Sequence, residues 1–468
     1  MRFVFFLLFF STCMIGQASS EPLPEPIRDA LRRARIPLSG VSLLVQQVEE
    51  RKPLLTLNAE RPMNPASTMK LLTTFAGLEM LGPAYQWKTE AYLDGALENG
   101  VLEGNLVFKG YGDPKLTIEQ FWMWLRELRL RGLREIRGDI VLDRSFFEDI
   151  GHDPAEFDND PTRAYNVGPN ALLLNFNALH LRLLPGTPEA NALLEPDLSG
   201  YAVRNRVRTS VRQPCRGGDT YTARLEERTI VLEGTIPRDC GEVDDYFSLL
   251  PHDQYFFAVF NALWQELGGT LRGSLREGSA PADRAAFSTR LSQPLSEVIR
   301  DINKFSNNIM ARQLFLTLGA TDGSSASIER STVVVKQWLD TQQMQFPELV
   351  LENGAGLSRV ERISVQHLAE LLQRAARSPF DAELKASLPV LGMDGTMKKR
   401  FKDEAMAGYA HIKTGMLEGV KSIAGYVHAD DGTQWIVVCV INHPNAARGQ
   451  AAQDALIEWV QKSKLKNS

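Results

Sequence analysis

Cysteine and histidine are scarce in this sequence, which has four Cys and seven His among its 468 residues. Four cysteines are too few for a scaffold built on disulfides, and no two of them form the CxxC pair of a zinc ribbon. The histidines include no HExxH motif and no other closely spaced pair. We therefore expect neither a bound metal nor a cofactor.

The chain also lacks a long run of basic residues. Lys and Arg total 52 against 57 Asp and Glu, which gives a net charge of −5. A mildly acidic protein of this kind lacks the electrostatic footprint of a nucleic-acid binder. Apolar residues at 44% and charged residues at 23% are ordinary globular proportions, which excludes disorder, collagen and coiled coil for the chain as a whole.

Long apolar runs are confined to the N-terminus. Residues 4–16 are almost entirely apolar, Arg2 precedes them, and small residues follow at 18–20. This pattern predicts a cleaved signal peptide at residues 1–20, with a buried N-terminal strand or helix as the alternative. Residues 10–12 before Cys13 do not match a lipidation site. After Glu21 no stretch approaches the roughly 18 apolar residues of a membrane-spanning helix, so we expect at most peripheral membrane association.

Export would bring the mature chain to the periplasm or another extracytoplasmic space, where disulfides form. Loss of the signal peptide leaves Cys215, Cys240 and Cys439. Cys215 and Cys240 lie in one region of strands and turns and are the natural disulfide pair; two free buried thiols are the alternative. Cys439 lies within an apolar segment and is expected in the core.

Hydrophobic patterning divides the mature chain into three regions. Residues 41–48 and 54–57 predict strands, followed by a helix that Asn64 caps, with Pro65 as its first residue. Gly82-Pro83 ends that helix. Between about 92 and 268, short β-prone segments alternate with turn residues, with one helix at 118–131. The last region predicts helices at 295–305, 309–318, 328–342 and 365–376, strands at 410–416, 422–428 and 435–441, and a closing helix at 451–461.

This order of elements predicts an α+β fold in which the first and last regions form one domain. We expect residues 21–88 plus 265–468 to make up that domain. Residues 89–264 are expected to be a strand-rich insertion made of two subdomains.

Ser67-Thr68-Met69-Lys70 forms an SxxK motif in the first turn of the predicted helix. Residues three apart share one helix face, so Lys70 can reach the Ser67 hydroxyl and act as its base. The N-terminus of the helix also suits an oxyanion. One or two such motifs are expected by chance, and a second occurs at 463–466, where a frayed chain end is expected.

Two further motifs occur once each. Ser306-Asn307-Asn308 is an SxN motif at the break between two predicted helices, where it could face a cleft or cap the second helix. Lys413-Thr414-Gly415 lies on a predicted strand, where Gly415 would allow close approach of a ligand backbone. Lys413 and Thr414 could hold a carboxylate; a protective lysine on an edge strand is the alternative.

The three motifs together, in this order, are the signature set of serine penicillin-binding proteins and β-lactamases. The wider sequence resembles the low-molecular-mass class C penicillin-binding proteins, which are D-alanyl-D-alanine carboxypeptidases and endopeptidases. The resemblance rests on residues 65–74 (PASTMKLLTT), 143–147 (DRSFF), 354–359 (GAGLSR) and 391–396 (LGMDGT). It implies a β-lactamase/transpeptidase-like domain, an antiparallel sheet with helices on both faces, that carries a large insertion.

The resemblance also implies roles for the motif residues. Ser67 would be the acylating nucleophile and Lys70 its base. Ser306 would relay a proton to the leaving amine, with Lys413 tuning it. Asn308 would bind the substrate amide and help to hold Lys70.

The remaining implied roles concern substrate binding. Thr414 and Lys413 would receive the terminal carboxylate, and Gly415 would lie against the substrate. The backbone N–H groups of Ser67 and Met416 would form the oxyanion hole. The family often places an acidic residue near the cleft, and Asp158 could meet a substrate amine there; a solvated acidic loop is the alternative.

This chain departs from the family pattern at two places. Met416 replaces the usual Thr after the KTG motif, so a hydroxyl for the substrate carboxylate is lost while the backbone N–H remains. At 352–357 the sequence is ENGAGL, in which the usual Asp and Ser of the DGSGL segment are replaced.

The resemblance predicts a DD-carboxypeptidase, and possible endopeptidase, that acts on peptidoglycan stem peptides and is covalently inhibited by β-lactams. A β-lactamase would use the same acylating groups, but we find no ExxxN loop to supply the base for fast deacylation. A wall-binding protein without turnover is a third hypothesis. The sequence does not specify an oligomeric state.

Overall fold

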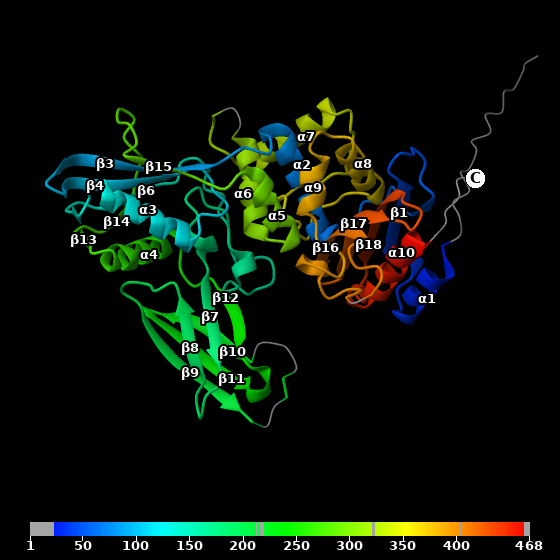
Figure 1. Cartoon of the computed structure of the whole chain (residues 1–468), viewed down its shortest axis with the longest axis horizontal. Coiled ribbons are helices and arrows are strands. Elements are labelled where there is room, and N and C mark those ends of the chain that lie inside the picture. The colour runs from blue at the N-terminus through cyan, green and yellow to red at the C-terminus, as the bar shows by residue number, and fades with distance from the viewer. Residues whose placement is uncertain (1–22, 212–213, 216–219, 321–322, 403, 463–468) are drawn as a thin grey trace, which may run out of the picture.

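The computed structural model describes residues 23–211, 214–215, 220–320, 323–402 and 404–462. The predicted signal peptide lies outside these residues. Figure 1 shows two lobes, one formed by the first and last segments of the chain and one by its middle segment. Within the described residues, no helix combines the length and apolar character needed to cross a membrane.

A five-stranded antiparallel sheet joins the two ends of the chain. Its strands are β1 (Val41–Gln47), β2 (Leu55–Leu57), β16 (Ala410–Leu417), β17 (Val420–His428) and β18 (Gln434–Asn442). Their order is β16-β17-β18-β1-β2, so that β1 lies in the interior of the sheet beside β18. This pairing explains why segments separated by most of the sequence form one domain.

Helices cover both faces of this sheet. On one face α1 (Glu25–Arg33) and α10 (Gln450–Lys462) pack with Leu43 and Val437. Leu44 and Val438 face a larger helical layer on the other side. That layer contains α2 (Lys70–Leu81), α5 (Leu295–Lys304), α6 (Asn308–Gly319), α7 (Ile328–Thr341), α8 (Val365–Ala376) and α9 (Asp381–Ser387). The predicted α+β arrangement is confirmed, and β1 is apolar on both faces because both are buried.

The middle segment builds the second lobe around a seven-stranded sheet with the order β13-β5-β4-β3-β15, to which β6 and β14 are added. Its strands are β3 (Lys88–Glu98), β4 (Val101–Gly110), β5 (Glu135–Ile136), β6 (Ile140–Asp143), β13 (Thr270–Leu271), β14 (Leu275–Glu277) and β15 (Ser288–Leu291). The helices α3 (Ile118–Leu130) and α4 (His252–Glu266) contribute to the same apolar core.

Two smaller three-stranded sheets complete this lobe. One contains β9 (Ala202–Ser210), β10 (Tyr221–Glu226) and β11 (Thr229–Pro237). The other contains β7 (Leu179–Leu184), β8 (Asn191–Glu195) and β12 (Val243–Phe247). The expected domain limits at 88/89 and 264/265 stay a prediction; strand pairing with the insertion continues as far as β15.

Four helices differ from the sequence predictions: α1, α2, α4 and α9. The predicted helix after Asn64 begins as a 3₁₀ turn, η2 (Ala66–Met69), and becomes α-helical only at Lys70. The Asn64 Oδ1 accepts the N–H of Ala66, and Pro65 lies outside the helix, so the expected cap is wrong in detail. Helices α1 and α9 were not predicted; both are short and begin after Pro24 or Phe380 without a side-chain cap.

Helix α4 corrects the expectation of a single helix between 92 and 268. Its buried residues include Tyr255, Phe256, Val259, Phe260 and Trp264. Aromatic and β-branched residues favour strands by intrinsic propensity, so this segment reads as β-prone. Burial of the helix within the insertion overrides that preference.

The cysteines follow the sequence prediction. Cys215 and Cys240 form a disulfide. Cys439 is a free thiol buried in β18, and burial raises its pKa to about 12. A thiol of this kind is inert, in keeping with a role in packing.

The disulfide should stabilise the insertion. Closing a loop of 25 residues restricts the unfolded chain and corresponds to about 3 kcal/mol in the chain-entropy account. We expect a non-reduced proteolytic digest to contain one linked peptide pair. The double substitution Cys215→Ser/Cys240→Ser should lower the midpoint of unfolding, and reduction of the wild type should lower it to a similar value. Recovery of two alkylatable thiols from the native protein would reject the bridge.

Candidate active site

Ser67 lies in the 3₁₀ turn that leads into α2, and Lys70 is the first residue of that helix. The Lys70 Nζ donates a hydrogen bond to the Ser67 Oγ at 3.0 Å. Ala66, just before Ser67, has a φ of 46°, a left-handed conformation that only tight surrounding contacts maintain. Gly356 supplies one of them, because a Cβ there would lie 1.9 Å from the Ala66 carbonyl oxygen.

The side chain of Lys70 is fully buried and has three hydrogen-bond acceptors. Besides Ser67, they are the Asn308 Oδ1 at 2.7 Å and the Ala355 carbonyl oxygen. Burial holds the pKa of Lys70 well below its usual range, and the positive charges of Lys413 and Arg312 lower it further. A neutral amine, the form that can accept a proton from Ser67, is therefore favoured.

Ser306 and Lys413 form the second polar pair. Ser306 lies between α5 and α6 with a φ of 57°, and its Oγ accepts a hydrogen bond from the Lys413 Nζ at 2.9 Å. Burial lowers the pKa of Lys413 to about 7. The side chain of Lys413 is fully buried, which overturns the alternative of an exposed protective lysine.

Asn307 caps α6, since its Oδ1 accepts the N–H of Met310 at 3.0 Å. The flanking Ser306 and Asn308 contact the two lysines instead. The SxN segment thus serves both as a helix cap and as part of the polar cluster.

Strand β16 carries the KTG motif at the edge of the five-stranded sheet. Gly415 lies against the turn that carries Ser67: a Cβ there would lie 2.8 Å from the Ser67 nitrogen and 2.3 Å from the Ser422 Oγ. The Thr414 Oγ1 donates to the Thr396 Oγ1 at 2.7 Å. Met416 follows as an exposed residue (66% relative exposure), so an apolar side chain stands where the family pattern has a hydroxyl.

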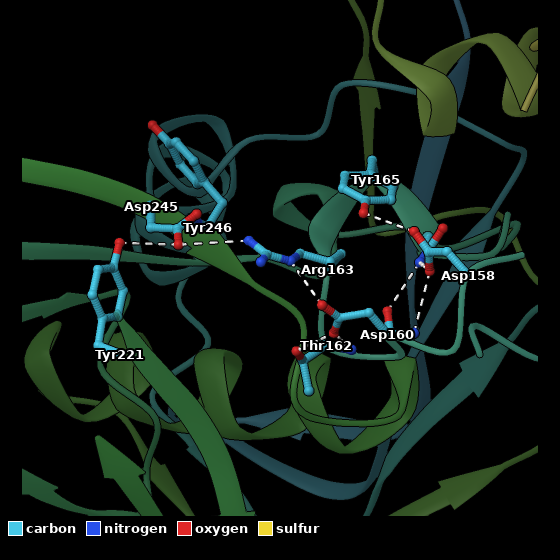
Figure 2. A network of polar contacts seen from close by, with 9 residues as sticks. Asp158, Asp160, Thr162, Arg163, Tyr165, Tyr221, Asp245 and Tyr246 are labelled. Atoms are coloured by element: carbon cyan, nitrogen blue, oxygen red, sulfur yellow. Dashed lines mark hydrogen bonds and ion pairs between the residues drawn. The ribbon is translucent and has the colours of Figure 1, made fainter. Parts of the chain in front are cut away.

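Asp158 lies on an exposed loop of the insertion, within a polar network that Figure 2 shows. Its carboxylate accepts hydrogen bonds from the Tyr165 hydroxyl at 2.8 Å and the Asn166 Nδ2 at 2.7 Å. The Asn308 Nδ2 donates to the Tyr165 carbonyl oxygen at 3.4 Å, which joins this loop to the SxN segment. Asp158 is thus an exposed residue whose loop contacts the SxN segment, and its role toward a substrate amine stays a prediction.

The same network reaches the small sheets of the insertion. The Arg163 Nε pairs with the Asp160 Oδ2 at 2.9 Å, and its Nη1 lies 3.9 Å from the Asp245 Oδ2 on β12 (Figure 2). The Tyr221 hydroxyl of β10 donates to the same Asp245 oxygen at 3.1 Å. The loop that carries Asp158 is thus anchored on both lobes.

The structure thus forms two hydrogen-bonded groups, Ser67–Lys70–Asn308 and Ser306–Lys413. They are joined by the SxN segment, which supplies a residue to each, and the charge of Lys413 acts on Lys70. Thr414, Gly415 and Met416 lie on β16, and the loop that carries Asp158 contacts Asn308. Arg312 and Glu361, which were not predicted from the sequence, are both buried, and their charges act on Lys70. Arg312 lies one helical turn after Asn308, which could have indicated it; Glu361 belongs to no motif.

Comparison with known proteins assigns the chain to a family. A family model described as the D-Ala-D-Ala carboxypeptidase 3 (S13) family matches residues 23–463. The D-alanyl-D-alanine carboxypeptidase DacB of Haemophilus influenzae is 26% identical over 411 residues, covering 86% of this chain and 85% of that protein. A D-alanyl-D-alanine carboxypeptidase of Actinomadura sp. is 27% identical over 419 residues, covering 84% and 76% respectively.

Solved structures are similar over both lobes. Penicillin binding protein 4 from Haemophilus influenzae gives a TM-score of 0.77 at 24% identity and covers 93% of this chain and 99% of that one. The predatory endopeptidase Bd0816 from Bdellovibrio bacteriovorus gives a TM-score of 0.52 at 15% identity, with coverage of 92% and 96%. These likenesses confirm the transpeptidase-like fold. Because the family model spans both lobes and all three motifs, the chain belongs to the D-Ala-D-Ala carboxypeptidase 3 (S13) family.

Proposed function

We propose that this protein is a serine DD-peptidase that cleaves the D-Ala–D-Ala bond of peptidoglycan stem peptides through an acyl-enzyme. The observation that carries the proposal is the cluster in which Lys70 contacts both Ser67 and Asn308 while Lys413 contacts Ser306. A serine hydroxyl, a buried amine as its base and a second hydroxyl–amine pair as proton donor can together carry out acyl transfer to serine. Family membership and the names of the relatives support the same substrate class.

Acylation begins with transfer of the Ser67 hydroxyl proton to the neutral amine of Lys70. The Ser67 Oγ then forms a bond to the carbonyl carbon of the penultimate D-alanine, whose oxygen becomes an oxyanion. The backbone N–H groups of Ser67 and Met416 stabilise that charge. Ser306 passes its proton to the nitrogen of the departing D-alanine as the C–N bond breaks, and takes a replacement from the Lys413 ammonium that donates to it. Water then attacks the ester and gives up one proton, which restores the Lys413 ammonium. The shortened peptide leaves as a carboxylic acid, and the Lys70 ammonium returns its proton to the Ser67 oxygen.

Recognition of the substrate falls to β16 and to the insertion. An extended peptide can add to the edge of β16, with its terminal carboxylate near Lys413 and Thr414. Lys413 in its charged form favours that carboxylate. Because Met416 offers no hydroxyl, the carboxylate loses one hydrogen bond relative to the common family pattern. Asp158 provides a negative charge for the free amine of a diamino-acid side chain in the stem peptide.

The cluster supports endopeptidase activity on cross-links as well, because the two activities differ only in what is attached to the leaving amine. β-Lactams would acylate Ser67 as substrate mimics; the relative from Haemophilus influenzae has been crystallised with one. We propose an extracytoplasmic location, which the Cys215–Cys240 disulfide supports.

Ser67→Ala should abolish the release of D-alanine and the covalent adduct with penicillin, because no other nucleophile replaces the lost Oγ. We expect both rates to fall by more than about a thousandfold, measured by a D-alanine assay and by intact mass. Ser463→Ala, in the second SxxK match of the sequence, is the matched control and should behave as wild type. A penicillin adduct that persists in the Ser67→Ala protein would contradict the assignment.

Asp158→Asn should reduce the preference for a substrate that carries a free side-chain amine. The ratio of kcat/KM for a D-Ala–D-Ala peptide with a free amine to that for its N-acetylated form should fall roughly two- to fivefold, the value of a solvent-exposed ion pair. Asp153→Asn, on the same loop and also exposed, is the control. An unchanged ratio for Asp158→Asn would show that the loop does not contact the amine.

A further inference from the structure

Glu361 is a carboxylic acid with no solvent exposure, close to the active-site cluster. Its Oε1 accepts three backbone hydrogen bonds, from the N–H groups of Glu352 at 3.1 Å, Asn353 at 2.9 Å and Gly354 at 3.0 Å. Its Oε2 is buried and has no hydrogen-bond partner among the described residues. A buried carboxylate is costly unless it is compensated, so its presence here needs a physical reason.

The loop 352–355, which donates N–H groups to Glu361, also contacts the first residues of α2. The Ala355 carbonyl oxygen accepts a hydrogen bond from the Lys70 Nζ, and the Gly354 carbonyl oxygen accepts one from the Thr73 Oγ1 at 2.6 Å. Gly354 has a φ of 65° and a Cβ there would lie 2.7 Å from the Phe315 ring, so the turn has little freedom to move. Glu361 thus fixes the carbonyl group that orients Lys70.

The charges around Lys70 are unbalanced without Glu361. Lys413 on β16 and Arg312 on α6 are cations that act on Lys70, and Glu361 is the anion that opposes them. Arg312 is buried, donates to the Val167 carbonyl oxygen at 3.1 Å, and also feels the charges of Glu361 and Glu352. Burial raises the pKa of Glu361, while the three N–H groups of its loop lower it and so stabilise the carboxylate.

We propose that Glu361 is a positioning residue for acylation: its Oε1 holds residues 352–354 so that the Ala355 carbonyl orients the Lys70 amine, and its negative charge sets how much of that amine carries a proton. The inference rests on the proposed function, in which Lys70 is the base. Two properties of the Glu361 side chain contribute: it accepts hydrogen bonds and it carries a negative charge. Glutamine retains the acceptor and removes the charge, so the two can be measured independently.

The experiment is the pH dependence of acylation. The second-order rate of penicillin adduct formation is measured between pH 5 and 9 for the wild type and Glu361→Gln. In the variant only the cations Lys413 and Arg312 remain to act on Lys70, so the pKa of Lys70 should fall. Its neutral amine would then persist to lower pH. We expect the acidic limb of the profile to move down by about one pH unit, with the plateau rate within a fewfold of wild type.

Glu352→Gln is the matched control, because it removes the same charge from an exposed position on the same loop and should leave the acidic limb in place. Glu361→Ala removes the hydrogen-bond acceptor as well as the charge and should lower the plateau rate of acylation. If the alanine variant does not fold, the Glu361→Gln profile alone decides the test. If the Glu361→Gln profile overlays that of an active wild type, the inference is wrong and the proposed function stands. If the wild type is not acylated at any pH, both are wrong.

Discussion

The burial of one amine, the Nζ of Lys70, is the constraint on which the active site depends. A lysine excluded from water must find partners or lose its charge, and here it meets both demands. Its hydrogen bonds to Ser67, Asn308 and the Ala355 carbonyl group come from three segments that are far apart in the sequence. The position of the nucleophile, the SxN segment and the loop before Glu361 are therefore fixed relative to one another through a single side chain.

The architecture supplies that convergence. Because β1 pairs with β18, the nucleophile turn that follows β2 and the KTG strand belong to one rigid sheet-and-helix unit. The insertion leaves this unit after α2 and returns before α5, and its loop at 158–168 touches α6 through Asn308 and Arg312. The second lobe is thus attached beside the point where Asn308 of the SxN segment contacts Lys70.

The positions of the three motifs on their helices and strand could be predicted from the sequence, because they depend on the periodicity of neighbouring residues. The spacing of Ser67 and Lys70 follows from helix periodicity, and the break at Ser306 from two adjacent amphipathic helices. The predicted start of the helix at Pro65 was wrong in detail. The chain forms a 3₁₀ turn there, and this turn depends on the contact between Ala66 and Gly356, which are far apart in the sequence. Helix α4 was missed because its aromatic residues favour strands until tertiary packing overrides them. Glu361 was missed because a single buried carboxylate has no sequence pattern.

The measurement that tests the central claim most directly is the mass of the mature protein followed over time after mixing with a penicillin, together with peptide mapping of the adduct. The account predicts a long-lived adduct of one drug molecule on Ser67, because the described site has acylating groups and no assigned base for rapid deacylation. A transient adduct with fast release of hydrolysed drug would indicate a β-lactamase. The absence of any adduct would contradict the account, since the cluster around Lys70 would then not activate Ser67.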